Sequence, residues 1–305
     1  MVNQTINPDT LNAVQRMQDY IEEHLQDLIT LKDLANAAGY SPFHASRLFK
    51  ELAGKTPFDY IRALRLSKAA LQLRDGDQAV VTVALDFVFA SHEGFTRAFS
   101  RQFGLPPREY RQKSPPIRLF MPYKVKQSHH AIQSGENKMD NNANPQAIFV
   151  QVIERPSRKL ILLRGIKAED YYAYCEEVGC DTWSILCSVK EALYEPVGLW
   201  LPEHLILPGT SRYAQGVEVP LDYDKPLPEG FELIELPACK MMVFQGEPYD
   251  DEVFETAISS IWEHIKKFDP TLYGYRFAPE SAPRIQLEPL GYRGYIEALP
   301  VVSIE

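Results

Sequence analysis

Two stretches of this chain repeat each other at an offset of fifty residues, and this repeat constrains the fold more than any other feature. Each copy has a small-residue turn, a short amphipathic segment with an arginine, a glycine and then a proline, which is the layout of a helix-turn-helix unit. The sequence therefore predicts an all-α N-terminal domain with two tandem helix-turn-helix motifs. The residues shared by stretches 41–60 and 91–110 are Ser41 and Ser91, Arg47 and Arg97, Phe49 and Phe99, Gly54 and Gly104, Pro57 and Pro107, and Tyr60 and Tyr110.

Capping residues mark where the helices begin and end. In the first unit, Thr30 and Asp33 have the spacing of a capping box, and Gly39 ends the helix that follows them. Ser41 caps the next helix, with Pro42 in its first position. Apolar residues at helical spacing predict the buried faces, which are Leu31, Leu34, Ala35 and Ala38, then Ala45, Leu48, Phe49 and Leu52 in the first unit, and Val83, Ala84, Phe87 and Val88, then Phe95, Ala98, Phe99 and Phe103 in the second.

The opposite faces of the two second helices carry residue types that reach base edges and phosphates. Arginine pairs bidentately with guanine, and Glu93 can accept a hydrogen bond from a cytosine amino group. Structural helical bundles have the same geometry with merely solvated arginines, but the matching arginines and helix ends favour DNA binding. The predicted DNA-contacting residues are Phe43, Ser46, Arg47 and Lys50 in the first unit and His92, Glu93, Thr96, Arg97 and Arg101 in the second.

Residues 10–112 resemble the DNA-binding domain of the AraC/XylS family of bacterial transcription regulators. The resemblance implies that Phe43, Ser46 and Arg47 lie on the first recognition helix and that His92, Glu93, Thr96 and Arg97 lie on the second. The chain departs from the family at Val88, where glycine is usual, so this helix end is expected to close differently. The motifs are Leu31-Lys-Asp-Leu-Ala-x-x-Ala-Gly-Tyr-Ser41, Arg47-Leu-Phe-Lys50, Ser91-His-Glu-Gly-Phe-Thr-Arg-Ala-Phe99, Phe103-Gly-Leu-Pro-Pro107 and Tyr110-Arg111.

Charge divides the chain, whose formal net charge is −9. Residues 1–113 hold 14 Lys and Arg against 13 Asp and Glu, residues 114–147 hold 4 against 2, and residues 148–305 hold 14 against 26. The acidity therefore belongs to the C-terminal part, where it favours solubility, repels nucleic acid or attracts cations. The predicted organisation is a DNA-binding domain at 1–113, a linker at 114–147 and an effector-binding domain at 148–305.

The linker is predicted from its polar and Pro-rich composition. Its more apolar piece, residues 117–123, is expected to pack on a neighbouring domain, whereas His129 and His130 are interpreted as solvated side chains. The chain has no apolar run of membrane-spanning length and no secretory leader at its N-terminus. These features predict a cytoplasmic protein with no membrane partner.

After Pro145 the alternation of apolar and polar residues predicts strands. Helices are predicted near residues 181–194 and 250–268, and the second is expected to bury Val253, Phe254, Ala257, Ile261, Trp262 and Ile265. Strands with two separated helices predict an α+β domain of two similar halves. The predicted strands are residues 148–153, 160–163, 197–201, 213–219, 233–236, 241–245, 284–290 and 295–301.

Aromatic residues are dense in this C-terminal part, which holds 20 of the 34 in the chain and all three tryptophans. They can line a pocket for a flat or hydrophobic molecule, and nearby carboxylates can neutralise a positive charge. Most aromatic residues must nevertheless build the core, and Trp262 is expected there. The aromatic residues left as candidate ligand contacts are Trp183, Trp200, Tyr213 and Tyr295.

Residues 148–305 resemble, through short patterns, the GyrI-like effector-binding domains of bacterial multidrug-responsive regulators. The resemblance implies a glutamate at the pocket floor on the last strand, for which Glu297 is the candidate. Glu297 lies three residues before Pro300 rather than the usual four, and this difference could turn its side chain to the other face. A buried carboxylate also needs a partner. The patterns are Asp181-Thr-Trp183, Pro196-Val-Gly-Leu-Trp-Leu-Pro202, Tyr213-Ala-Gln-Gly-Val-Glu-Val219 and Tyr295-Ile-Glu-Ala-Leu-Pro300.

Catalytic and metal motifs are weak in this chain. Cys175, Cys180 and Cys187 lack the paired short gaps of zinc sites and are interpreted as isolated, partly buried thiols. No catalytic residue, metal or cofactor is predicted, so the protein is not expected to be an enzyme. Some GyrI-like proteins are hydrolases of small electrophiles, and that alternative would make Glu297 or Tyr213 catalytic.

The sequence as a whole predicts a bacterial transcription regulator that reads a bipartite site in double-stranded DNA. A small hydrophobic effector, with cations among the candidates, is expected in the C-terminal domain, and RNA polymerase is the expected protein partner. Tandem readers need no second copy, so a monomer is predicted. The alternatives are a hydrolase and a drug-sequestering protein whose DNA-binding domain is regulatory or vestigial.

Overall fold

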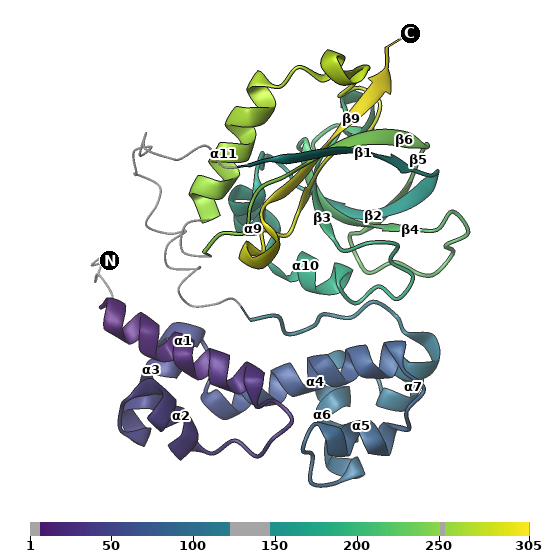
Figure 1. Ribbon diagram of the computed structural model, residues 1–305. Helices are drawn as coiled ribbons and strands as arrows, with labels where there is room; N and C mark the ends of the chain where they lie inside the picture. The colour runs from purple at the N-terminus through teal and green to yellow at the C-terminus, as the bar shows by residue number, and fades with distance from the viewer. Residues whose placement is uncertain (1–6, 123–146, 251–253, 305) are drawn as a thin grey trace. The chain divides into compact units, whose positions relative to one another are not determined.

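The computed structural model describes residues 7–122, 147–250 and 254–304, and the chain divides into two compact units (Figure 1). Residues 8–114 lie in a helical unit, and residues 147–304 lie in a unit built on a β-sheet. Residues 115–118 belong to the sheet unit and residues 119–122 to the helical unit. Most of the predicted linker, including His129 and His130, lies outside the described residues.

The helical unit confirms the prediction of an all-α N-terminal domain. Helices α1, α2 and α3 pack on one another, α4 continues from α3, and α5, α6 and α7 pack with α4. Most residues expected in the core are buried, with Ala45, Phe49, Phe95 and Phe99 fully inaccessible. The expected core residues that are only half-buried are Leu31, Leu52, Val88, Ala98 and Phe103. The helices are α1 (Pro8–Glu23), α2 (Leu31–Ala38), α3 (Pro42–Ala53), α4 (Pro57–Asp75), α5 (Val80–Asp86), α6 (His92–Phe103) and α7 (Pro107–Lys113).

The predicted capping residues begin and end these helices. The Thr30 backbone N–H donates to the Asp33 carboxylate at 2.9 Å and the Asp33 N–H donates to the Thr30 hydroxyl at 3.3 Å, which completes the capping box of α2. The hydroxyls of Ser41 and Ser91 cap α3 and α6. These local bonds satisfy backbone donors that helix ends leave unpaired, so both second helices begin at a defined residue.

The sequence predicted that the turn after α5 closes differently from the turn after α2, but the two turns close in the same way and differ only in the residue that forms them. Gly39 ends α2 with φ of 73°, and Val88 takes the equivalent place after α5 with φ of 60°. The Tyr40 N–H donates to the Ala35 carbonyl, and the Phe89 N–H likewise donates to the Ala84 carbonyl, so both turns close with the same bond. A β-branched residue is strained in this left-handed region. The turn after α5 therefore adopts the same conformation as the turn after α2, although Val88 is unfavourable in that conformation.

Replacing Val88 with glycine should relieve this strain. Removing a β-branched residue from the left-handed region stabilises the folded state by about 1–2 kcal/mol. The greater freedom of glycine in the unfolded chain lowers the stability again by about 0.5–1 kcal/mol. We expect Val88→Gly to stabilise the helical unit by about 1 kcal/mol, measured by calorimetry of the full-length chain. Val81→Gly, at an exposed position of α5, is the control and should destabilise the unit. The same sign of change for both variants would contradict the strain argument.

The sheet unit confirms an α+β C-terminal domain, with the described strands in one nine-stranded antiparallel sheet. The strand order is β1-β6-β9-β8-β3-β4-β2-β5, and β7 pairs with β9. Helices α9 and α10 pack on β4, and α11 packs on β6. The elements are β1 (Phe149–Arg155), β2 (Arg158–Arg164), α9 (Tyr171–Val178), α10 (Asp181–Leu186), β3 (Val197–Trp200), β4 (Tyr213–Val219), β5 (Glu232–Leu236), β6 (Cys239–Gln245), α11 (Phe254–Lys267), β7 (Tyr275–Phe277), β8 (Arg284–Leu287) and β9 (Ile296–Ser303).

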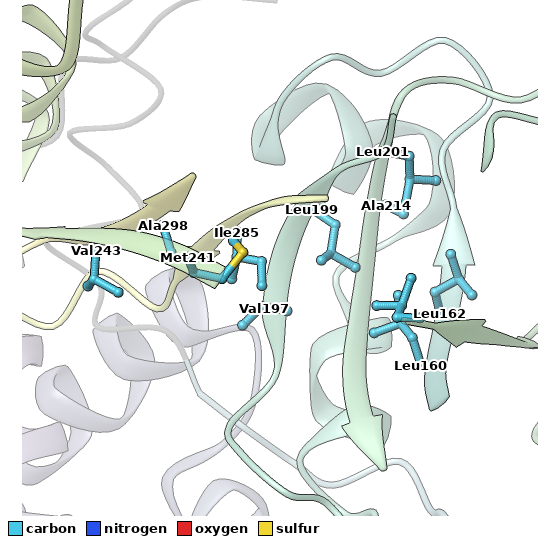
Figure 2. Close-up of a cluster of buried hydrophobic side chains, with 11 residues drawn as sticks. Leu160, Leu162, Val197, Leu199, Leu201, Ala214, Met241, Val243, Ile285 and Ala298 are labelled. Carbon is cyan, nitrogen blue, oxygen red and sulfur yellow. The ribbon is translucent and has the colours of Figure 1, made fainter. Parts of the chain in front are cut away.

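The two faces of this sheet have different coverings. One face carries the apolar cluster drawn in Figure 2, which takes side chains from β2, β3, β4, β6, β8 and β9. Because side chains alternate along a strand, the neighbouring residues lie on the opposite face. There Met242 and Phe244 of β6 pack with Ile261 of α11. The second face is therefore the one that the helices cover.

A buried ion cluster connects the two ends of the sheet. Arg155 is the last residue of β1, and Arg158 is the first residue of β2, although these strands stand near opposite ends of the strand order. Both guanidinium groups bind the carboxylate of Glu218 on β4, with 2.7 Å from Arg158 Nε to Glu218 Oε1. Arg158 and Glu218 are 0% and 2% exposed. The two-residue connection brings the end of β1 to the start of β2, and the cluster ties both ends to β4.

Removing the charge of Glu218 should destabilise the sheet unit strongly. Glu218→Gln leaves two buried guanidinium groups without their counter-ion, and breaking a buried pair costs about 3–5 kcal/mol. Glu235→Gln on β5 is the matched control because that side chain is exposed, and it should change stability by less than about 0.5 kcal/mol. Equal unfolding midpoints for the two variants would show that the cluster does not hold the sheet.

Three elements of this unit differ from the sequence prediction. The helix expected over residues 181–194 ends at Leu186, because the Ser188 hydroxyl donates to the Ile185 carbonyl and the Leu193 N–H donates to the Glu218 carbonyl on β4. Helix α9 and strand β7 were not predicted. Both are short, at 8 and 3 residues, so they offer little periodicity to detect.

Candidate nucleic-acid interface and an aromatic ion-pair site

Helix α3 presents the residues predicted to contact DNA on its outer side. Phe43 is 81% exposed, Arg47 and Lys50 are also exposed, and Ser46 is half-buried. The opposite side of the helix is anchored in the core, where the ring of Phe49 meets the ring of Tyr60 on α4 at 5.1 Å. A helix anchored along one side can present the other side rigidly to a groove.

Helix α6 repeats this arrangement with two differences. His92, Glu93, Arg97 and Arg101 are exposed, but the hydroxyl oxygen of Thr96 is buried and has no hydrogen-bond partner among the described residues. As it lies, that hydroxyl does not reach a base. The pKa of Glu93 is lowered by its own backbone N–H and by the Ser91 hydroxyl at the start of α6. A base contact by Glu93 would therefore compete with its bonds at the helix end.

Arginines in the helical unit differ in whether they bond to other parts of it. Arg16 donates to the carbonyls of Ala37 and Ala38 at 2.8 Å, and Arg65 donates to the carbonyls of Leu25 and Asp27 at 2.8 and 2.5 Å. These two side chains tie helices and loops together. By contrast, Arg47, Arg97 and Arg101 form no hydrogen bond or ion pair with the described part of the chain. The arginines on the outer sides of α3 and α6 thus remain available for a ligand.

In the sheet unit, Glu297 lies on the helix-covered face. Its neighbour Ala298 belongs to the apolar cluster of the other face, so the alternation of β9 turns Glu297 towards α11. The Glu297 side chain is fully buried. Although Glu297 lies three residues before Pro300 rather than the usual four, its side chain therefore still points towards the helices.

Three donors surround the Glu297 carboxylate. Trp262 Nε1 donates to Oε2 at 2.6 Å, and the Tyr295 hydroxyl donates to the same oxygen at 3.2 Å. Arg284 Nε donates to the other oxygen, Oε1. Burial, and then the charge of Glu297, raises the pKa of Tyr295 well above its ordinary value, so Tyr295 remains a donor. The partner that the buried carboxylate requires is thus an arginine of this chain.

The Arg284 guanidinium lies between two indole rings. Its central carbon is 4.6 Å from the ring centroid of Trp200 and 5.3 Å from that of Trp262. Trp200 Nε1 donates to the Glu169 carbonyl at 2.9 Å, which fixes the first ring. The Arg284 side chain is 33% exposed, so the site reaches the surface. We call the set Trp200, Trp262, Tyr295 and Glu297 the aromatic cage.

Of the other two residues predicted to contact a ligand, Tyr213 lies next to this cage and Trp183 lies elsewhere. The buried ring of Tyr213 is 5.2 Å from that of Trp200 and supports it from behind. A Cβ atom at Gly198 would approach the Tyr213 hydroxyl to 2.7 Å, so this position requires glycine. Trp183 lies instead beside Glu288, whose pKa is raised mainly by burial. Trp183 therefore does not join the cage.

Two residues of this site, Trp262 and Arg284, were not predicted to contact a ligand. Trp262 was expected in the core, but it is 37% exposed and forms one wall of the cage. Arg284 was not among the candidates, because an isolated arginine at the start of a strand gives no signal of its own. Its alternation with the core residue Ile285 on β8 could have indicated the face it occupies.

The cysteines of this part of the sheet unit are free thiols. Cys175 and Cys187 are half-buried as predicted, whereas Cys180 is exposed. Burial raises the pKa of Cys175, which lies near Cys180, to about 12. The turn at Gly179, with φ of 89°, brings them together. Within the described residues, no group of three or more His, Cys, Asp and Glu side chains is placed to hold a metal ion, and no helix is long and apolar enough to cross a membrane.

Comparison with known proteins places relatives on the helical part of the chain. Residues 34–113 match a family model described as a helix-turn-helix domain. The transcriptional regulator Rob of Salmonella typhimurium is 38% identical over 119 residues, which are 36% of this chain and 41% of Rob. The right origin-binding protein of Escherichia coli is 37% identical over the same shares of the two chains. The chain thus spans less than half the length of these two relatives.

A smaller relative is covered almost completely. The regulatory protein SoxS of Escherichia coli is 33% identical over 100 residues, which are 33% of this chain and 94% of SoxS. Among solved structures, the DNA-binding domain of AdpA in complex with a target DNA is 28% identical, with a TM-score of 0.32 over 33% of this chain and 91% of that one.

Proposed function

This chain belongs to the AraC family of DNA-binding transcriptional regulators, and we propose that it reads one bipartite DNA site with α3 and α6. The two helices would enter successive major-groove segments about 10 base pairs apart on one face of the duplex. The observation that carries the proposal is that the arginines on the outer sides of α3 and α6 are exposed and, within the described part of the chain, unbonded. Arginines that hold the unit together are bonded to carbonyls, whereas Arg47, Arg97 and Arg101 face outward without a partner among the described residues.

The residues proposed for this contact follow from exposure. Phe43, Arg47 and Lys50 on α3 and His92, Arg97 and Arg101 on α6 are open to solvent. Ser46, Glu93 and Thr96 complete the proposed set, in which Thr96 would need its hydroxyl to turn outward. A single copy of the chain supplies both helices, so we propose that a monomer binds the site.

Replacing Arg47 or Arg97 with alanine should weaken specific DNA binding. If each side chain pairs with a base, each replacement costs about 1–3 kcal/mol and relaxes specificity at one position. The affinity is measured by fluorescence anisotropy on a duplex selected from a random library, at one fixed salt concentration. Arg62→Ala is the control, because Arg62 is exposed on α4 and pairs with Asp59 at 3.4 Å.

The outcomes of this measurement separate the possible contacts. A uniform loss across sequences with a smaller salt dependence would assign phosphate contacts. Affinities of both variants equal to that of Arg62→Ala would remove α3 and α6 as the reading helices.

We propose that the sheet unit is a GyrI-like effector-binding domain that modulates DNA affinity or the contact with RNA polymerase. Its strand order supports two similar halves. One half is β1, β2, β3 and β4, and the other is β5, β6, β8 and β9. In the order β1-β6-β9-β8-β3-β4-β2-β5, the second, fourth and third strands of one half mirror those of the other, and the two first strands, β1 and β5, are exchanged. The proposed effector is small and hydrophobic, and it would bind between the helices of the two halves, where Trp200, Tyr295 and Glu297 meet. Thermal shifts with a panel of aromatic cations, anions and neutral compounds test this assignment.

We assign no catalytic role to this unit. A general base needs a free carboxylate within reach of the proton that it removes. The Glu297 carboxylate already accepts bonds from Trp262, Tyr295 and Arg284. The domain therefore fits a binding role within a transcription regulator.

A further inference from the structure

The aromatic cage has the composition of a cation-binding site and already contains a cation. A positive group held between aromatic faces and next to a carboxylate gains from cation–π attraction and from charge pairing. Here the two faces belong to Trp200 and Trp262, the carboxylate is that of Glu297, and the positive group is the Arg284 side chain.

We propose that Arg284 is a built-in occupant of a cation site, which excludes external cations from the cage until the arginine leaves. The inference rests on the proposed effector domain and deepens it, because it identifies the residue that determines the ligand's charge. The ligand class of the opened site is a planar organic cation of the guanidinium or amidinium type, which reproduces the group now seated there.

The hydrogen bonds show which atom such a cation would meet. Trp262 and Tyr295 both donate to Glu297 Oε2, so these neutral donors already satisfy one oxygen. Arg284 alone among the described residues donates to Oε1. Removal of the arginine side chain would leave Oε1 without its donor. It would also open the cage to solvent, because the Arg284 side chain is itself 33% exposed.

A tethered occupant competes strongly with a free one. The guanidinium of Arg284 is held beside the cage by its own strand, so its effective concentration is in the millimolar range or above. An external cation binds only the fraction of molecules in which the arginine has left, and its apparent affinity is reduced by that fraction. Neutral or apolar ligands that pack on the outside of the tryptophans do not meet this competition.

The test is chemical complementation of Arg284→Ala in the full-length chain. Phenylguanidinium is the probe, and phenylurea is the neutral control of nearly the same shape. Calorimetric titration at pH 7 should show phenylguanidinium binding to Arg284→Ala at least about tenfold more tightly than to the wild-type chain. The probe should also raise the unfolding midpoint of the variant with concentration, and phenylurea should do neither.

A double variant assigns this binding to the cage. Arg284→Ala/Glu297→Gln keeps the opened space but removes the negative charge, so phenylguanidinium should bind it about tenfold or more weakly than it binds Arg284→Ala. Equal binding by the wild-type chain and Arg284→Ala, or by the single and double variants, would overturn the proposal. If Arg284→Ala does not fold, Arg284→Gln keeps an uncharged donor near Glu297, and the same comparison is made with it.

DNA binding is measured on the same proteins in parallel. A folded Arg284→Ala that reads DNA but takes up no phenylguanidinium would refute the internal occupant and leave the DNA-reading proposal standing. A wild-type chain that selects no DNA sequence would refute the proposed function, whatever the cage binds.

Discussion

The ion cluster of Arg155, Arg158 and Glu218 is the interaction on which the sheet unit depends. A carboxylate and a guanidinium lose their hydration when they are buried, and only close pairing with further hydrogen bonds compensates for that loss. Arg158 meets this condition, because it also donates to the carbonyls of Pro156 and Pro237 at 3.1 Å. The cluster ties the connection between β1 and β2 to β4, a strand that does not pair with β1. One cluster of apolar side chains fills one face of the same sheet (Figure 2).

The packing of the apolar cluster determines which side chains lie on the opposite, helix-covered face of the sheet. Once Ile285 and Ala298 point into the apolar cluster, Arg284 and Glu297 must point to the helix-covered side. There the same rule for buried charge applies again, and Glu297 is tolerated because Arg284, Trp262 and Tyr295 donate to it. One buried ion cluster thus ties strands of the sheet together, and a second buried pair, Arg284 and Glu297, lies at the site proposed for an effector.

The sequence predicted the helical unit better than the sheet unit because its signals are local. Capping residues such as Thr30 and Ser91 act within three residues of their partners, so spacing alone identifies them. In the sheet unit the strands were recognisable from alternation, but their order depends on pairings between distant segments. Trp262 shows what helical spacing cannot predict. The spacing identified the side of α11 that faces the sheet, but it did not show that Trp262, at the edge of that side, is partly exposed. The pairing of Arg284 with Trp200 joins residues 84 positions apart, and no local pattern reports it.

Helix α4 connects two unlike reading helices, so the proposed DNA site has an orientation. The helix has 19 residues, or about 28 Å, and it carries α3 at one end and the α5–α6 pair at the other. The two readers are unlike, since α3 presents Phe43 and Lys50 where α6 presents Glu93 and Ser100. A palindromic sequence would match a symmetric dimer, whereas the proposed site would have two different halves in a fixed order. Reversing such a site in front of a gene would exchange which of the two reading helices lies nearer to that gene.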